Sequence, residues 1–232
     1  MFLAGLFFLF INPVFTVIFL VGVFPAFSLG EYFDSYNRSS VLMYDLEESY
    51  LKKYTQLIEA FDLVCKSKKK WHIEASGDVT NLTDWKRNAG AGKVIRRKDT
   101  QLDYALPKVI KSNVIPPSIK VGLQTIYFFP DVMFVFDEKK VGAVTYKDLS
   151  VEVSTTRFIE DETVPKDSEI VGYTWKHPNK KGGPDRRYSN NYEIPICLYE
   201  MMHLTSASGV NEIVEVSKVG HLKKFKASLD DL

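Results

Sequence analysis

Cysteine is scarce in this sequence, and net charge is almost absent. The 232 residues include only Cys65 and Cys197, which form neither a C-x-x-C pair nor a zinc-ligand cluster. The sequence contains 30 lysines and arginines and 29 aspartates and glutamates, so its formal net charge is +1. We therefore expect no disulfide framework and no strong overall attraction to nucleic acid, so any binding of charged partners must depend on local patches.

Charge is also missing from the first 30 residues, which contain 22 apolar side chains and eight of the 16 phenylalanines. About 20 apolar residues suffice to span roughly 30 Å of hydrocarbon. We therefore predict a transmembrane anchor over residues 1–30, with a helix from Leu3 to Phe24 that is kinked near Pro13. A cleaved signal peptide is the alternative, since residues 26–28 loosely fit a cleavage site. However, no basic residue precedes the apolar run, and the run is longer than a signal core.

The basic residues nearest to this run, Arg38, Lys52 and Lys53, all follow it. The positive-inside rule then places the large C-terminal part in the cytoplasm. The sequence thus predicts a single-pass protein of the inner (cell) membrane.

Residues 31–70 are predicted to form an amphipathic helical stalk. An apolar residue recurs there at every seventh position, at Met43, Tyr50, Leu57 and Val64. This stripe either packs on the domain that follows or joins two copies through residues 43–64. The second alternative is the weaker one, because Lys53 and Ala60 occupy the other seam position of a coiled coil.

Residues 71–232 are predicted to form a β-rich domain, because apolar residues alternate there with a period of two. Roughly eight short strands are expected, and Pro130-Asp131 marks a hairpin between two of them. Strand patterns occur over residues 71–75, 94–95, 123–129, 132–136, 141–146, 149–153, 170–175, 194–204 and 213–216. A helix with an apolar stripe through Leu222, Phe225 and Leu229 follows. The predicted fold class is α+β, with a mainly antiparallel barrel or sandwich closed by this C-terminal helix.

Two resemblances accompany this pattern. The stretch TIYFFPDVMFVFDEKKVGAVTYKDLSVEV resembles the strand and hairpin pattern of bacterial pleckstrin-homology-like and GRAM domains. From Trp71 onward, and most distinctively in KKGGPDRR, the chain is similar to an uncharacterised family of bacterial membrane-associated proteins. These resemblances imply a pleckstrin-homology-like fold and a membrane compartment, and they imply no activity.

No catalytic or metal-binding motif stands out. The string Gly90-Ala91-Gly92-Lys93 lacks the other residues of a phosphate loop, because Arg87 and Val94 stand where Gly and Ser or Thr are needed. Asp131 and Glu138 only mimic a metal-nuclease pattern. The four histidines have no metal-ligand spacing. We therefore expect no enzyme activity, no metal and no cofactor.

Two basic segments are the candidate binding residues. Residues 84–98 carry six basic residues and one acidic residue. Residues 176–187 carry five basic residues and one acidic residue. Residues 157–169, by contrast, carry five acidic and two basic residues. Backbone amides at Gly182-Gly183 and paired arginines suit a phosphate-like anion. The predicted anion site comprises Lys180, Lys181, Arg186, Arg187, Lys86, Arg87, Arg96 and Arg97.

Two readings of these segments compete. In the first they bind an anion. In the second they form a solvated hairpin whose Arg186 and Arg187 pair with the acidic loop at 160–169. Nucleic acid is disfavoured, because few aromatic residues are interleaved with the cations.

The functional hypothesis is a membrane-anchored, non-catalytic binding module whose β domain engages a protein partner or an anionic lipid or phosphate ligand. The alternatives are a membrane-embedded effector gated by a ligand in the β domain, and an enzyme with no recognisable motif.

Overall fold

The computed structural model describes residues 39–78, 93–137 and 140–232, and they fall into two units. The smaller unit contains β1 (Ser40–Leu42) and β5 (Ile110–Ser112), which pair in parallel. Oδ1 of Asn113 accepts a hydrogen bond from the Tyr44 backbone N–H at 2.9 Å, and Nδ2 of Asn113 donates one to the Tyr44 carbonyl at 2.8 Å. The larger unit comprises Asp45–Ala105 and Val114–Leu232 and holds all the elements described below.

One sheet of the larger unit is antiparallel and has the order β4-β6-β7-β8-β9. Its strands are β4 (Leu102–Tyr104), β6 (Pro117–Val121), β7 (Gln124–Phe128), β8 (Val132–Phe136) and β9 (Val141–Thr145). Gly122, with φ of +59°, makes the two-residue turn between β6 and β7, a conformation that favours glycine. The predicted hairpin across Pro130-Asp131 is confirmed, because Phe128 of β7 pairs with Met133 of β8.

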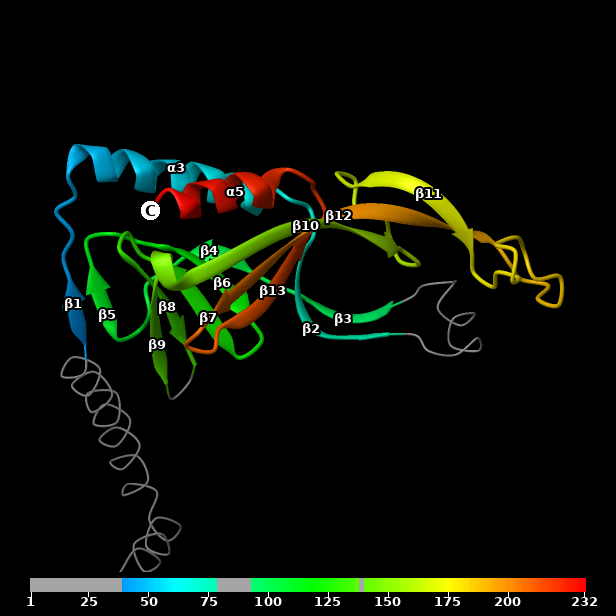
Figure 1. The fold of residues 1–232 in the computed structure, drawn as a ribbon, viewed down its shortest axis with the longest axis horizontal. Coiled ribbons are helices and arrows are strands. Elements are labelled where there is room, and N and C mark those ends of the chain that lie inside the picture. The colour runs from blue at the N-terminus through cyan, green and yellow to red at the C-terminus, as the bar shows by residue number, and fades with distance from the viewer. Residues whose placement is uncertain (1–38, 79–92, 138–139) are drawn as a thin grey trace, which may run out of the picture. The chain divides into compact units, whose positions relative to one another are not determined.

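The other sheet has the order β10-β12-β13-β2-β3, with β11 also on β12 (Figure 1). Its strands are β2 (Lys70–Asp78), β3 (Lys93–Asp99), β10 (Leu149–Ile159), β11 (Glu169–Trp175), β12 (Glu193–Ser206) and β13 (Asn211–Val216). A single 3-10 turn, η1 (Tyr146–Asp148), leads into β10. The long β12 pairs with β11 along its first half and with β13 along its second half. The first half of β12 and β11 therefore form an arm, which is separate from the β2–β3 hairpin (Figure 1).

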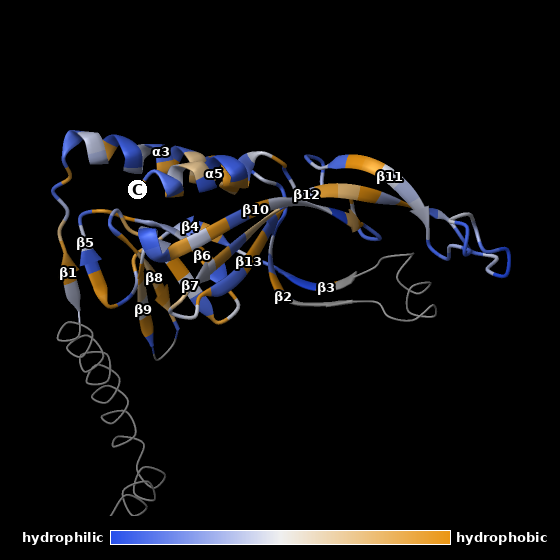
Figure 2. Ribbon diagram, viewed as in Figure 1, coloured by the Kyte–Doolittle hydropathy of each residue, from blue (hydrophilic) through white to orange (hydrophobic). Residues whose placement is uncertain are grey.

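Two helices, α3 (Glu48–Cys65) and α5 (His221–Asp230), pack on each other and share one core with both sheets. Phe225 of α5 lies at the junction. Its ring centroid is 5.5 Å from that of Phe61 on α3 and 5.3 Å from that of Phe128 on β7. Both helices carry hydrophilic as well as hydrophobic residues along their length (Figure 2).

The predicted stalk helix is shorter than the periodicity indicated, because Ser40–Leu42 is a strand and α3 begins at Glu48. Its apolar stripe packs on the β sheets of its own chain, the first of the two alternatives. Buried on this face are Tyr54, Leu57, Ala60, Phe61 and Val64.

The predicted fold class was wrong. The described residues are mostly strand, with only two α-helices, and those of the larger unit form two open sheets rather than a closed barrel. A period of two identifies a strand but not its neighbour, so a run of strands could not distinguish a pleckstrin-homology-like barrel from two separate sheets.

The membrane assignment is also corrected. Within the described ranges, no helix is long and apolar enough to cross a membrane. This finding contradicts the predicted single-pass protein and its inner-membrane localisation. Residues 1–30, on which that prediction was made, lie outside the described residues.

Candidate binding site

The basic segment at 176–187 lies in the loop of residues 176–192, which joins β11 to β12 at the end of the arm and which we call the basic loop. It is held by bonds within itself. The rings of His177 and Tyr188 stack with centroids 4.0 Å apart, and Pro178 forms an isolated bridge with Pro184. The carboxamide of Asn191 accepts the His177 amide at 3.0 Å and donates to the His177 carbonyl at 2.9 Å. The loop is therefore ordered before any partner arrives.

Asn179 organises the glycine turn of this loop. Its side-chain oxygen accepts hydrogen bonds from the backbone N–H of Lys181 at 2.8 Å and of Gly183 at 3.1 Å. Its side-chain nitrogen donates a hydrogen bond to the Pro184 carbonyl at 3.2 Å. The Gly182 amide donates to the Asn179 carbonyl at 3.0 Å. The backbone amides expected to face an anion are thus already bonded inside the loop.

The cations of the loop divide into two groups. Arg187 is bound to Asp185, with Nε 3.0 Å from Oδ1 and Nη2 2.6 Å from Oδ2, and these bonds raise its pKa. By contrast, the side chains of Lys180, Lys181 and Arg186 are exposed and make no bond to any described residue. We call these three side chains the cationic tip.

The other predicted site residues do not join the cationic tip. Arg96 and Arg97 lie on β3, in a hairpin separate from the arm. Arg96 is exposed, whereas Arg97 is partly buried. Lys86 and Arg87 lie outside the described residues. The structure thus gathers Lys180, Lys181, Arg186 and Arg187 on one loop.

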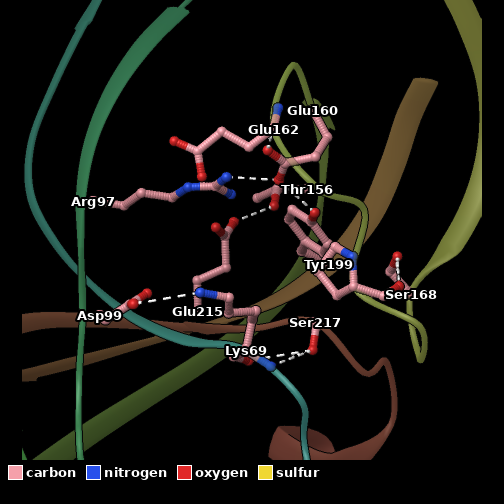
Figure 3. A network of polar contacts seen from close by, with 11 residues as sticks. Lys69, Arg97, Asp99, Thr156, Glu160, Glu162, Ser168, Tyr199, Glu215 and Ser217 are labelled. Carbon is pink, nitrogen blue, oxygen red and sulfur yellow. Dashed lines mark hydrogen bonds and ion pairs between the residues drawn. The ribbon is translucent and has the colours of Figure 1, made fainter. Parts of the chain in front are cut away.

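Arg97 belongs instead to a polar network at the base of the arm (Figure 3). Its guanidinium lies over the rings of Trp71, 4.1 Å from the centroid, and Phe158, 3.9 Å from the centroid. Its Nη2 donates to Glu160 Oε2 at 2.6 Å, and the hydroxyl of Tyr199 donates to the same oxygen at 2.7 Å. A cation held between aromatic faces and paired with a buried carboxylate is fixed in position.

A second carboxylate, Glu215 of β13, is fully buried in this network (Figure 3). Its Oε1 accepts the hydroxyl of Thr156 at 2.6 Å. Burial raises the pKa of Glu215, while the Thr156 bond and the Arg97 charge act in the opposite direction. Side chains from β3, β10, β12 and β13 therefore meet here, and they join the arm to the β2–β3 hairpin.

Reasoning from the sequence missed the role of Arg97 and of Asn179. One signal for Arg97 was available, because it lies two residues after Ile95 and so shares a face of β3 with an apolar residue. In one of the two competing readings the acidic loop at 160–169 pairs with Arg186 and Arg187, whereas in the structure Glu160 of that loop pairs with Arg97. No comparable signal marks Asn179, since asparagine is common in loops.

A groove of about 410 Å³ lies on the larger unit, beside the β6–β7 turn. It is lined by His72, Glu74, Lys98, Asp99, Thr100, Gln101, Lys120, Gly122 and Leu123. Most of its charged groups are already paired. The Nζ atom of Lys98 lies 2.6 Å from Oε1 of Glu74, and Nε2 of His72 lies 2.7 Å from Oε2 of Glu212. The groove therefore presents less unpaired charge than the cationic tip.

Comparison with protein-family models, curated proteins and solved structures finds no match to this chain.

Proposed function

We propose that this protein is a non-catalytic binding module that takes an acidic segment of a protein partner on its basic loop. The observation that carries the proposal is the cationic tip. Lys180, Lys181 and Arg186 are exposed, lie within seven residues of one another, and have no counter-ion among the described residues.

The bonding of the loop favours carboxylates over a phosphate group as the ligand. A phosphate site normally uses backbone amides that converge on the anion. Here the amides of Lys181 and Gly183 are occupied by Asn179. Recognition is left to long, flexible side chains, which suit several carboxylates spaced along an extended peptide.

The internal bonds of the loop reduce the cost of binding, because little backbone has to be ordered when the partner arrives. Tyr188, which is 42% exposed and stacked on His177, adds an aromatic surface beside the cations. Exposed ion pairs contribute only about 0.2–1 kcal/mol each, so we expect weak binding that salt reduces strongly.

The test uses the full chain and a fluorescein-labelled peptide in which glutamate alternates with glycine. Fluorescence anisotropy should show binding at low salt, and the triple variant Lys180→Ala, Lys181→Ala and Arg186→Ala should lose it. Lys223→Ala with Lys224→Ala is the matched control, since both lysines are exposed on α5, and it should bind as the wild type does.

Three outcomes would overturn the proposal. The triple variant could bind as tightly as the wild type, or the wild type could bind equally well to a peptide with lysine in place of glutamate. The third outcome is binding to vesicles that contain phosphatidylserine without binding to the acidic peptide, which would assign the basic loop to a lipid surface.

A further inference from the structure

The outer edge of β11 has no partner strand among the residues that the structure describes. In the part of the chain that the structure describes, β11 pairs only with β12. Three of its apolar side chains are exposed, with Ile170 44%, Val171 40% and Tyr173 62% accessible. The apolar stretch at its start is visible in Figure 2. An exposed apolar edge strand is a template for pairing with another strand.

The backbone of Tyr173 faces this edge. Tyr173 lies opposite Pro195 of β12, and Pro195 has no N–H to donate. The Pro195 carbonyl accepts the Glu160 amide at 3.0 Å, on the other side of β12. Pro195 therefore bonds nothing on β11, and the N–H and carbonyl of Tyr173 point away from β12.

A bulge in β11 determines which side chains share a face of the strand. The register shifts between Ile170 and Gly172, so Val171 is the extra residue. Glu169 lies opposite Leu198, and the Lys176 amide bonds the Tyr192 carbonyl. Their partners Leu198 and Tyr192 are an even number of residues apart on β12, which has no bulge here, so both point to one face of the sheet. Glu169 and Lys176, which lie opposite them, therefore share that face.

The same reasoning puts Ile170 and Trp175 together on the opposite face, because they lie opposite Cys197 and Glu193. Tyr173, opposite Pro195, shares that face. A second copy of β11 can be placed antiparallel to the first, with Tyr173 on the two-fold axis that relates them. Val171, the extra residue of each bulge, then has no residue directly opposite it. The opposed residues are then Glu169 with Lys176, Ile170 with Trp175, Gly172 with Thr174, and Tyr173 with its own copy.

Every pair in this register joins side chains from the same face, and the outermost pairs join opposite charges. We propose that two copies of this chain associate through β11 in this antiparallel register. The pairing buries Ile170 and Tyr173 and gives the outward Tyr173 backbone groups hydrogen-bond partners. It also forms two Glu169–Lys176 ion pairs, one at each end.

The charges around β11 favour the antiparallel orientation. Residues 157–169 before the strand carry five acidic and two basic side chains, whereas residues 176–187 after it carry five basic and one acidic. An antiparallel pair sets the acidic end of one copy against the basic end of the other, and a parallel pair would oppose like charges.

The association goes beyond the proposed function and uses different residues. Lys176 directly follows β11 and is the first residue of the basic loop, whereas the cationic tip lies further along that loop. A dimer would carry two cationic tips, so a partner with two acidic segments would bind it more tightly than a partner with one.

The test is sedimentation velocity of the full chain over a range of concentrations. The wild type should form a dimer, and Glu169→Lys alone and Lys176→Glu alone should shift it to monomer by opposing like charges. The double variant Glu169→Lys with Lys176→Glu restores opposite charges and should restore the dimer. Lys224→Glu, an exposed charge reversal on α5, should leave the dimer unchanged.

A second variant tests the backbone pairing. Tyr173→Pro removes the N–H that points away from β12, so it should give a monomer with an unchanged circular dichroism spectrum. The proposal is overturned by a wild type that stays monomeric at every concentration, by single charge reversals that remain dimeric, or by a double variant that stays monomeric. These results are independent of the acidic-peptide measurement, whose variants leave β11 intact.

Discussion

Arg96 and Arg97 are neighbours on β3 with different surroundings. Successive residues of a strand point to opposite faces, so Arg96 faces solvent while Arg97 faces the aromatic rings at the base of the arm. Both were candidate anion ligands on charge alone. Sequence reasoning could identify the cations of this protein, but the partner of each cation depends on strands that are distant in the chain.

The first prediction concerns this pair of arginines. Arg97→Ala leaves the carboxylate of Glu160, whose side chain is 1% exposed, without its cation. Removing one partner of a buried ion pair typically costs about 3–5 kcal/mol. Chemical denaturation should therefore show a large loss in the free energy of unfolding for Arg97→Ala.

Arg96→Ala is the matched control, and it should change the free energy of unfolding by less than about 0.5 kcal/mol, as exposed substitutions usually do. Equal effects of the two substitutions would refute a structural role for the Arg97–Glu160 pair.

The second prediction concerns Glu215 and pH. Burial raises its pKa above the ordinary 4.5, so the folded state favours the protonated carboxyl. This stabilisation is complete below the unfolded pKa and is lost as pH rises through the folded pKa. Glu215→Gln keeps a neutral polar group at this position at every pH. The free energy of unfolding should therefore fall less between pH 4.5 and pH 8 in the variant than in the wild type. An identical pH dependence would contradict the raised pKa.

At the scale of elements, the basic loop depends on one side chain. Asn179→Ala removes the acceptor for the Lys181 and Gly183 amides and should loosen the glycine turn. Trypsin cleaves after lysine and arginine, so limited proteolysis should cut the variant within residues 180–187 faster than the wild type. Asn190→Ala, an exposed asparagine of the same loop, should be cut at the wild-type rate. Equal rates for all three proteins would show that Asn179 does not organise the loop.

Elements with a strong pattern were predicted and those without one were missed. The β7–β8 hairpin and the C-terminal helix α5 follow from long apolar stripes. In contrast, β4 and β5 have three residues each and β6 begins at Pro117, so none of them carries a readable alternation. Short strands of this kind are specified by their neighbours in the sheet rather than by their own residues.

At the scale of the whole molecule, one helix pair packs against both open sheets of the larger unit. A closed barrel would have needed hydrogen bonds between strands that here belong to different sheets. The larger unit instead depends on side chains that reach from α3 and α5 onto both sheets. Phe225 is one of the residues buried where the helices and the sheets meet.

The last prediction follows from this position. Phe225 is fully buried and contacts Phe61 of α3 and Phe128 of β7. Phe225→Ala should cost about 3–5 kcal/mol, which is a large part of the roughly 5–15 kcal/mol that stabilises a typical domain. Leu51→Ala, at a site on α3 that is 50% exposed, is the control and should change stability little. Because one core joins helices and sheets, far-ultraviolet circular dichroism and tryptophan fluorescence should report a single, coincident transition at a lower denaturant concentration. Two separate transitions would show that the sheets unfold independently of the helix pair.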